Sequence, residues 1–318
     1  MALGEFELIA QYFSRSSSRS DVLAGVGDDA ALLVVPADEV LVAATDTLVE
    51  GRHFLPDAPP ESVGHQALAV NLSDLAAMGA RPAWALLALS LPQSDPAWLE
   101  GFARGFYALA ERCGVALVGG DTVRGPRVVT VHALGFVPAT AALRRHGARP
   151  GDGLYVSGTL GDAAAGLEQL AGGNATAAHP SLVQRYRYAE PRLALGVALR
   201  GIASAAIDVS DGLLGDLDKL CAASGVAAVV HLERLPLSGA LRASFDAGAA
   251  ERLALGGGDD YELLFTVPPA AELDLSARLA VAGDITRIGQ IVAGRGIRCM
   301  RGAQTVEPRI TGYDHFAG

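Results

Sequence analysis

The sequence predicts an α/β protein with two domains, and three observations lead to this prediction. The chain has 318 residues, which is more than one ordinary hydrophobic core serves. Half of the residues are apolar, with alanine prominent among them, as in closely packed helices and sheets. Strand-like runs also alternate with runs of helical periodicity along most of the chain.

Periodicity identifies the elements of the first half of the chain. Alternating residues over 40–48 predict a strand, and leucines at helical spacing predict a helix over 59–79. The next helix should begin after Asp95, a good N-cap followed by proline, and should end at Gly114. Buried strands are expected between and after these helices, at 81–92, 115–118 and 127–138.

The second half repeats this alternation after a break rich in proline, glycine and arginine at 138–152. The break is the best candidate for a domain boundary, although its charges could equally line a site. It predicts an N-terminal domain over 1–140 and a C-terminal domain over 141–318. The later elements should be a strand over 154–158, a helix over 162–170, a long helix ending near Arg200, and a strand with a capped helix over 205–225.

Charge and cysteine content exclude several classes of protein. The chain has 35 acidic and 25 basic residues, a net charge of −10, and no basic stripe that suggests nucleic-acid binding. The three cysteines are too widely spaced for a disulfide framework or a CxxC zinc site. The N-terminus lacks the charge of a signal peptide, and no uncharged stretch is long enough to span a membrane. We therefore expect a cytoplasmic protein without membrane or nucleic-acid partners.

One phrase occurs twice in the chain. "GVGDDAALL" begins at Gly25, and "GGGDDYELLF" begins at Gly256. Adjacent aspartates repel each other, and the glycines before them make the backbone more flexible than a strand favours. A distant internal duplication is one explanation, but the flanking sequences do not match. The other explanation is a function that needs carboxylates beside a flexible backbone.

Carboxylates lie in apolar or glycine-rich surroundings at five places, where an unpaired buried charge would be costly. Together they predict an oxygen-rich cage for Mg²⁺ and phosphate. Simpler explanations exist for two places, because Asn71 and its neighbour Asp74 could bond to backbone. Likewise, Ser210 or Asp211 could cap a helix. The five places are Asp28 with Asp29, Asp46, Asp74, Asp121 after two glycines, and Asp208 with Asp211.

A nucleotide bound here would have to be held without the usual lysine. There is no GxxxxGK[ST] loop, and the only lysine, Lys219, lies within a predicted helix. Metal ions, arginine and backbone N–H groups are left to offset the phosphate charge. If the acceptor were itself a phosphate monoester, it would be largely dianionic at neutral pH and would need no general base. We therefore assign no catalytic side chain.

Read in order, the motifs resemble the thiamine-monophosphate kinase family over essentially the whole chain. Single motifs occur throughout the wider superfamily of aminoimidazole ribonucleotide synthetase, whereas the full series is specific. The motifs that carry the resemblance are "GEFELI", "GVGDDAALL", "ATDTLVEGRHF", "ALAVNLSDLAAMGARP", "LVGGDTVRG", "AIDVSDGLLGDL", "GGGDDYELLF" and "GYDHF".

The resemblance implies an activity and an assembly. It implies transfer of the γ-phosphate of ATP to thiamine monophosphate with several Mg²⁺ ions, which yields thiamine diphosphate in the final step of its biosynthesis. It also implies a homodimer in which mixed sheets of two α+β N-terminal domains meet. Each would be followed by an α/β C-terminal domain, in the fold of aminoimidazole ribonucleotide synthetase.

The residue roles that the resemblance implies fall into three groups. The metal ligands would be Asp29, Thr45, Asp46, Asp74, Asp121, Asp208 and Asp211. The ATP contacts would be Gly120, Asp121, Arg145 and Ser210, with Arg144 and Arg149 as rivals of Arg145. The thiamine substrate would face His53, Asp259 and Tyr313.

Two positions depart from the family pattern, and two other functions stay open. Asp259 stands where many members have glutamate, and "RYAEPR" keeps only Pro191 and Arg192 of an expected Arg-Pro-x-Pro-Arg. The alternatives are another ATP-using enzyme of the superfamily and a non-catalytic Mg-ATP-binding protein. The chain lacks the N-terminal reactive cysteine with a nearby lysine of selenophosphate synthetases and the terminal cysteine of hydrogenase-maturation relatives.

Overall fold

The computed structural model describes residues 4–15, 19–172, 178–279 and 284–307. The chain folds into two compact units. Unit 1 consists of Met1–Leu75 and Ala80–Thr140, and unit 2 of Ala76–Gly79 and Ala141–Gly318. Each unit combines helices with a mixed sheet, so the predicted α/β fold class is confirmed.

Unit 1 is built on a four-stranded sheet in the order β3-β6-β4-β5. Strands β3 and β4 run antiparallel to β6, and β5 runs parallel to β4. The bounds are Glu39–Val49 for β3, Arg81–Leu91 for β4, Ala116–Arg124 for β5 and Val128–Pro138 for β6. The predicted strands are confirmed, except that β5 was expected to end before Gly119 and instead continues through the two glycines.

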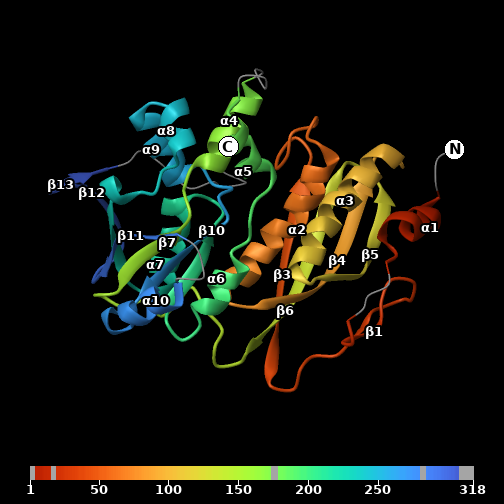
Figure 1. Ribbon diagram of the computed structural model, residues 1–318, viewed down its shortest axis with the longest axis horizontal. Helices are drawn as coiled ribbons and strands as arrows, with labels where there is room; N and C mark the ends of the chain where they lie inside the picture. Colours follow the sequence, from red (N-terminus) through yellow and green to blue (C-terminus); the bar gives the residue numbers. More distant parts are fainter. Residues whose placement is uncertain (1–3, 16–18, 173–177, 280–283, 308–318) are drawn as a thin grey trace. The chain divides into compact units, whose positions relative to one another are not determined.

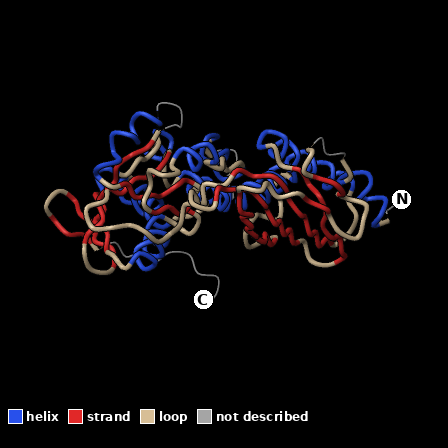
Figure 2. Tube along the Cα trace, turned by 90° about the horizontal axis from the view of Figure 1, so that it is seen from below, coloured by secondary structure: helices blue, strands red, loops and turns tan. Residues whose placement is uncertain are grey.

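Helices α2 (Pro60–Ala77) and α3 (Pro96–Cys113) lie side by side on one face of this sheet (Figures 1 and 2). Glycines let their backbones touch. A Cβ on Gly64 would lie 2.0 Å from the carbonyl oxygen of Phe102, and one on Gly105 would lie 1.9 Å from that of Glu61. The predicted helices are confirmed, including the Asp95 N-cap of α3 and the left-handed C-cap at Gly114.

Among the described residues of unit 1, few cover the other face of the sheet. The short strands β1 (Val22–Ala24) and β2 (Leu32–Leu33) pack at one corner, over Trp84 and Phe136. They follow helix α1 (Glu5–Leu8) and the π-helix η1 (Ile9–Phe13). Along β3 the side chains on this open face are exposed, and they include Leu41, Ala43, Thr45 and Thr47.

Unit 2 contains a seven-stranded sheet in the order β13-β12-β9-β11-β7-β10-β8. Strands β9 and β12 pair in parallel, and the other neighbours are antiparallel. The strands are β7 (Gly153–Ser157), β8 (Ala205–Val209), β9 (Ala227–His231), β10 (Glu262–Val267), β11 (Ile285–Val292), β12 (Gly296–Arg301) and β13 (Gln304–Val306).

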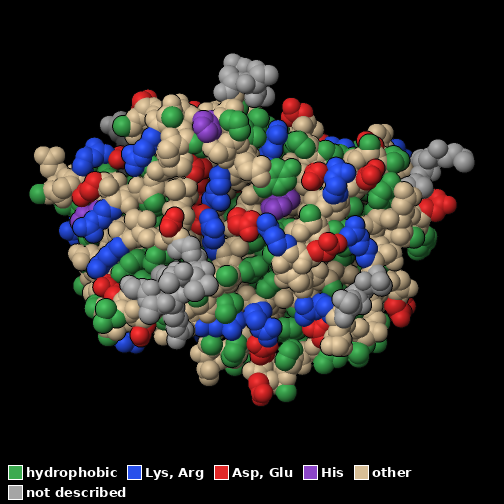
Figure 3. Space-filling view, viewed as in Figure 1, with side chains coloured by type: hydrophobic (Ala, Val, Ile, Leu, Met, Phe, Trp, Pro, Cys, Tyr) green, Lys and Arg blue, Asp and Glu red, His purple; other side chains and the backbone are tan. Residues whose placement is uncertain are grey.

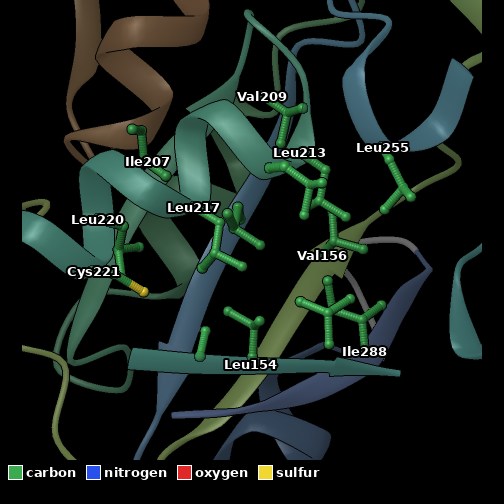
Figure 4. Close-up of a cluster of buried hydrophobic side chains, with 14 of the residues drawn as sticks. Leu154, Val156, Ile207, Val209, Leu213, Leu217, Leu220, Cys221, Leu255 and Ile288 are labelled. Carbon is green, nitrogen blue, oxygen red and sulfur yellow. The ribbon is translucent and has the colours of Figure 1, made fainter. Parts of the chain in front are cut away.

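Helices complete unit 2, and apolar side chains from its strands and helices form several core clusters, one of which is shown in Figure 4. Leu154, Ile207 and Leu217 lie in that cluster and are fully or almost fully buried. The helices are α4 (Asp162–Ala171), α5 (Pro180–Arg187), α6 (Leu193–Ala198), α7 (Leu213–Ser224), α8 (Gly239–Ser244), α9 (Ala247–Gly256), α10 (Glu272–Leu279), and the short η2 (Leu232–Arg234) and η3 (Pro269–Ala271).

One predicted element of unit 2 is wrong. A single long helix was expected to end near Arg200, but the chain forms α5 and α6 with an irregular segment over 188–192 between them. Pro191 explains the break, because it has no N–H to donate and disfavours helical backbone at the residue before it.

The structure also bears on the class of protein. No helix in the described ranges is long and apolar enough to cross a membrane. None of the three cysteines forms a disulfide. On the face shown in Figure 3, acidic and basic side chains are interspersed, and no continuous basic surface lies there.

Candidate functional site

Unit 1 contains a cavity of about 930 Å³ that is lined by two of the glycine–aspartate segments. Residues 26–29, from the first Asp-Asp phrase, line it together with residues 119–122 of β5. The exposed carboxylates of Asp29 and Asp121, which are far apart in the chain, thus border one cavity. Apolar side chains line the rest of it: Phe6, Ile9, Phe13, Leu33, Leu86, Leu87 and Leu117.

Asp28 has a local structural role in this wall. Its Oδ1 accepts the N–H of Asp29 at 2.9 Å, which steadies the turn after Gly27. Gly27 itself has a φ of 116°, a conformation that favours glycine. The sequence left Asp28 without an assignment, and the hydrogen bond shows how it holds its neighbour Asp29 in place.

Gly120 can only be glycine in this fold. Its φ is 152°, and a Cβ would lie 1.8 Å from the carbonyl oxygen of Leu87 on the paired strand β4. The register between β4 and β5 shifts just before this point, between Ala85 and Leu86. A register shift of this kind bends a strand locally, and here it brings an exposed glycine backbone to the cavity wall.

The side chains of Thr45 and Asp46 point to opposite faces of strand β3, since successive side chains of a strand alternate. Thr45 points to the open face, and its hydroxyl donates to the carbonyl oxygen of Val131 at 3.2 Å. Asp46 is half-buried on the face that also carries the buried Leu48, which is the face covered by helices. The side chains of Thr45 and Asp46, both predicted ligands, therefore lie on different sides of the sheet. Only Asp46 lies on the side covered by helices, which is also the side of Asp74 in α2.

Asn71, one turn before Asp74 on α2, has an unpaired polar atom. Its Nδ2 donates to the carbonyl oxygen of Ala67 at 3.0 Å, as the simpler explanation expected. Its Oδ1, however, is buried and has no hydrogen-bond partner among the described residues. A buried acceptor without a donor is unusual, and it fits a bound water or cation beside Asp74.

His53 lies in the turn that follows β3. Its Nδ1 accepts the backbone N–H of Val49 at 3.0 Å, so the ring's remaining proton belongs on Nε2 when the imidazole is neutral. In this tautomer the Nε2–H can donate a hydrogen bond to a phosphate or another acceptor.

In unit 2 the structure brings together two turns that are about 50 residues apart in the sequence. The N–H of Asp259 donates to the carbonyl oxygen of Ser210 at 2.9 Å, and the N–H of Tyr261 donates to that of Val209 at 2.8 Å. Gly258 makes room for this contact, because a Cβ there would lie 2.7 Å from the Ser210 oxygen. Asp208 is buried in β8, directly before this pair of turns.

The backbone around Asp259 is strained. Asp259 has a φ of 59° and Tyr261 a φ of 51°, and each such left-handed residue other than glycine costs about 1–3 kcal/mol. Burial raises the pKa of the Asp259 carboxyl to about 6, and the charge of Asp211 adds to this shift, whereas a hydrogen bond from the Tyr261 hydroxyl opposes it. Strain and a raised pKa in one turn are typical of a functional site.

Helix α7 begins in a way that the sequence did not predict. Neither Ser210 nor Asp211 caps it with a side chain, since the N-cap is Gly212. Instead Asp216, buried one turn into the helix, accepts the N–H groups of both Ser210 and Asp211 at 2.9 Å. The helix-capping explanation is therefore wrong, because the side chains of Ser210 and Asp211 make no capping hydrogen bond.

Lys219, the only lysine of the chain, lies beside this turn. Its Nζ is 2.5 Å from Asp211 and 2.8 Å from Asp216. Burial raises the pKa of Asp216, although the Lys219 ammonium and the Asp211 N–H counteract that effect. The sequence-based prediction missed both Asp216 and the role of Lys219. The available signal was that these two residues are three positions apart on one helix, a spacing that allows an ion pair.

The remaining predicted residues are less constrained. Arg145 has an exposed side chain, while its carbonyl oxygen accepts the Ser224 hydroxyl at 3.1 Å. Its rivals Arg144 and Arg149 are exposed as well. Tyr313 lies outside the described residues.

The predicted cage is not assembled as one cluster of carboxylates. Within the described ranges, no group of three or more His, Cys, Asp or Glu side chains lies close enough to hold a metal ion. Mg²⁺ nevertheless usually takes only one or two carboxylates and completes its shell with water and substrate phosphates. The oxygen donors Asp29 and Asp121 at the cavity fit such a site, as does the unpaired Oδ1 of Asn71.

Comparison with known proteins identifies both halves of the chain. The family described as AIR synthase related protein, N-terminal domain, matches residues 27–137. The corresponding C-terminal domain family matches residues 149–301. The thiamine-monophosphate kinase of Salmonella typhimurium is 50% identical over 324 residues, covering 100% of this chain and 99% of the relative. That of Haemophilus influenzae is 44% identical over 324 residues, covering 99% of each.

Solved structures agree with these relatives. The crystal structure of thiamine-monophosphate kinase from Stenotrophomonas maltophilia K279a has a TM-score of 0.87 and 48% identity, covering 94% of this chain and 97% of that one. The structure described as AaThiL complexed with AMPPCP and TMP has a TM-score of 0.79 and 36% identity, covering 92% of both chains. Hydrogenase maturation protein HypE in complex with ATP, at 20% identity and a TM-score of 0.76, shares the fold alone. The chain therefore belongs to the thiamine-monophosphate kinase family, and its two halves have the AIR synthase related fold.

Proposed function

We propose that this chain transfers the γ-phosphate of ATP to thiamine monophosphate. In the reaction the bond between the γ-phosphorus and the bridging oxygen of ATP breaks, and a phosphate oxygen of thiamine monophosphate forms the new bond, which gives ADP and thiamine diphosphate. The observation that carries the proposal is the cavity of unit 1, which Asp29, Gly120 and Asp121 line together with apolar side chains. The high identity to thiamine-monophosphate kinases over the whole chain supports it.

The cavity offers complementary surfaces to the two ends of ATP. Phe6, Ile9 and Phe13 from α1 and η1 form an apolar wall that suits the adenine ring. At the other wall, the glycine backbone around Gly120 lets a phosphate approach closely. We place the triphosphate at Gly120 and Asp121, with the adenine toward Phe6.

Charge neutralisation is the main task of this site. Two phosphates about 4 Å apart repel by about 4 kcal/mol per pair of unit charges at an effective dielectric of about 20. Bound Mg²⁺ would supply positive charge to both phosphates at this point. Asp29 and Asp121, which line the cavity, are the proposed ligands of one ion there. Thr45, Asp46, Asp74, Asp208 and Asp211 stay proposed ligands of further Mg²⁺ ions.

The acceptor needs orientation more than activation. The phosphate of thiamine monophosphate is largely dianionic at neutral pH, because its second pKa is near 6, so no side chain has to remove a proton. We propose that His53 Nε2–H donates to the substrate and that the Asp259 carboxylate attracts the positive thiazolium ring. Ser210 and Arg145 would contact ATP, and Tyr313 would stack on the thiamine.

The direct test is an assay of the purified protein with ATP, Mg²⁺ and thiamine monophosphate. Formation of thiamine diphosphate and ADP in equal amounts is expected. Bound ATP without product would instead indicate a nucleotide-binding protein that does not turn over. Turnover with a different acceptor and none with thiamine monophosphate would indicate another enzyme of the same fold.

Replacing Asp259 by alanine should raise the apparent KM for thiamine monophosphate more than the apparent KM for ATP. The carboxylate is the proposed partner of the thiazolium charge, and at about pH 8 it is ionised because its pKa is about 6. Steady-state kinetics with each substrate varied in turn measure the effect. Asp274→Ala, at an exposed position of α10, is the control. An equal rise in both KM values would contradict the substrate role.

We also propose that the open face of the unit 1 sheet binds a second copy of the chain. Leu41 on β3 is 46% exposed, and the neighbouring positions of this face carry Ala43, Thr45 and Thr47. An exposed, weakly polar sheet face of this kind is more typical of an interface than of free surface. The free thiols are consistent with a cytoplasmic location for this assembly.

Leu41→Glu should convert the dimer into a monomer, because a carboxylate would be buried in the interface without a partner. Size-exclusion chromatography with light scattering measures the mass. Leu273→Glu serves as the control, since Leu273 is 84% exposed and lies on α10 in unit 2. A variant that stays dimeric, or a wild-type protein that is monomeric, would refute the proposed interface.

A further inference from the structure

Glu262, the first residue of β10, carries a carboxylate in the interior of unit 2. Its side chain is 0% exposed. Burying a carboxylate is costly unless it is paired and hydrogen-bonded, so the surroundings of Glu262 need to supply several donors. Glu262 lies three positions after Asp259 in the second glycine–aspartate phrase, and no role was assigned to it from the sequence.

Two arginines and a serine supply those donors. Arg185 Nη2 lies 2.8 Å from Glu262 Oε1. Arg192 donates through two nitrogens of its guanidinium, from Nε to Oε2 at 2.7 Å and from Nη2 to Oε1. The Ser157 hydroxyl donates to Oε2. This set, which we call the Glu262 hub, joins helix α5 and the end of the irregular segment after it to the start of β10.

The fold makes room for the hub. Gly158 has a φ of 54°, and a Cβ there would lie 2.2 Å from Glu262 Oε1. The glycine therefore allows the carboxylate to reach both arginines. A bidentate arginine–carboxylate pair also fixes orientation in a way that a point charge does not.

The hub is connected directly to the turn that carries Asp259. Arg185 Nη2 also donates to the carbonyl oxygen of Asp260 at 3.2 Å. The Asp260 carboxylate, itself buried, accepts the N–H of Gly161 at the start of α4, at 2.8 and 3.0 Å. Asp260 and Glu262 are thus both restrained, while Asp259 and Tyr261 keep their left-handed backbone.

We infer that the Glu262 hub is a positioning device for the thiamine end of the substrate. A strained turn relaxes unless the surrounding structure holds it, and Arg185 with Arg192 provides that hold through Glu262 and Asp260. The inference rests on the proposed function, because it takes Asp259 as the substrate contact. It also gives a task to Arg192, in the segment that departs from the family pattern.

The test replaces Arg192 by glutamine in the full chain. Arg185 still pairs with Glu262 in this variant, so the buried carboxylate keeps one charged partner. The apparent KM for thiamine monophosphate should rise at least about tenfold, because small displacements of a positioning group cost that much or more. The apparent KM for ATP should stay within about twofold. Arg192→Lys, which keeps the charge and loses the two-pronged geometry, should fall between wild type and Arg192→Gln.

Arg301→Gln is the matched control. It makes the same substitution in the same unit and breaks an arginine–glutamate ion pair, in which Arg301 Nη2 lies 2.8 and 2.6 Å from the two oxygens of Glu251. That pair is at the surface, with the arginine side chain 58% exposed. Both KM values should therefore match those of the wild type.

Amide hydrogen exchange tests the restraint without any turnover. The N–H groups of Asp259 and Tyr261 are hydrogen-bonded in the structure, so their exchange should become faster in Arg192→Gln and stay unchanged in Arg301→Gln. Unchanged exchange in residues 256–262, or an equal rise in both KM values, would overturn the inference. If the wild type forms no thiamine diphosphate, the proposed function fails, whereas the exchange result still decides whether the hub restrains the turn. If Arg192→Gln does not fold, Arg192→Lys is judged by the same two measurements.

Discussion

Asp121→Asn is expected to lower kcat by at least about 100-fold, the scale on which one charge-stabilising group contributes to catalysis. Asparagine keeps the shape of the side chain and one acceptor oxygen, but it removes the negative charge that would hold a metal ion at the cavity. Because the Asp121 side chain is exposed and has no ion-pair partner among the described residues, stability should change little. Steady-state kinetics at saturating ATP and Mg²⁺, together with a thermal melt, measure both quantities.

The control for this prediction is Asp38→Asn, at an exposed position that does not line the cavity. Its kcat and melting temperature should match those of the wild type. If Asp121→Asn kept wild-type kcat, Asp121 would not be part of the phosphate site. If it lost activity and unfolded together, the effect would be one of stability, and the proposed ligand role would lose its support.

Gly120→Ala is expected to lower both stability and turnover. The added methyl group would lie 1.8 Å from the carbonyl oxygen of Leu87, which is backbone and cannot rotate away. Strand β5 must therefore shift away from β4, at a cost of about 1–3 kcal/mol, as for other overpacked positions. A shift of about 1 Å in the cavity wall should reduce kcat by about 100-fold, because reacting groups are displaced.

The neighbouring glycine supplies the control for Gly120→Ala. A Cβ on Gly119 would meet only the end of the Leu86 side chain, at 3.1 Å, and that side chain can adjust. Gly119→Ala should therefore keep most of its activity and lose little melting temperature. Equal effects of the two substitutions on thermal melts and kinetics would show that steric contact with β4 is not what makes Gly120 necessary.

Elements with strong local signals could be predicted. Helix α3 begins after Asp95, whose Oδ1 accepts the N–H of Ala97 and Trp98, and it ends at the left-handed Gly114. Capping depends on residues within one turn of each other, so the sequence alone contains the needed information. Strand β3 is likewise visible in the alternation of its residues.

Other elements depended on contacts that local patterns do not show. Strand β5 continues past Gly119 because β4 offers it hydrogen-bonding partners as far as Arg124. The start of α7 relies on Asp216 rather than on the residues that resemble caps. In both cases the deciding partner comes from a backbone or side chain whose position is set only after folding.

Local sequence is sufficient to place carboxylates beside glycines at strand ends and turns, and hence to predict phosphate chemistry and the family. Tertiary structure decides that Asp29 and Asp121 line the same cavity and that the backbone of Asp259 pairs with the Ser210 turn. It also decides that Glu262 forms ion pairs with Arg185 and Arg192. The physical reason is that periodicity and capping act over a few residues, whereas these contacts form between segments that only sheet pairing and core packing bring together.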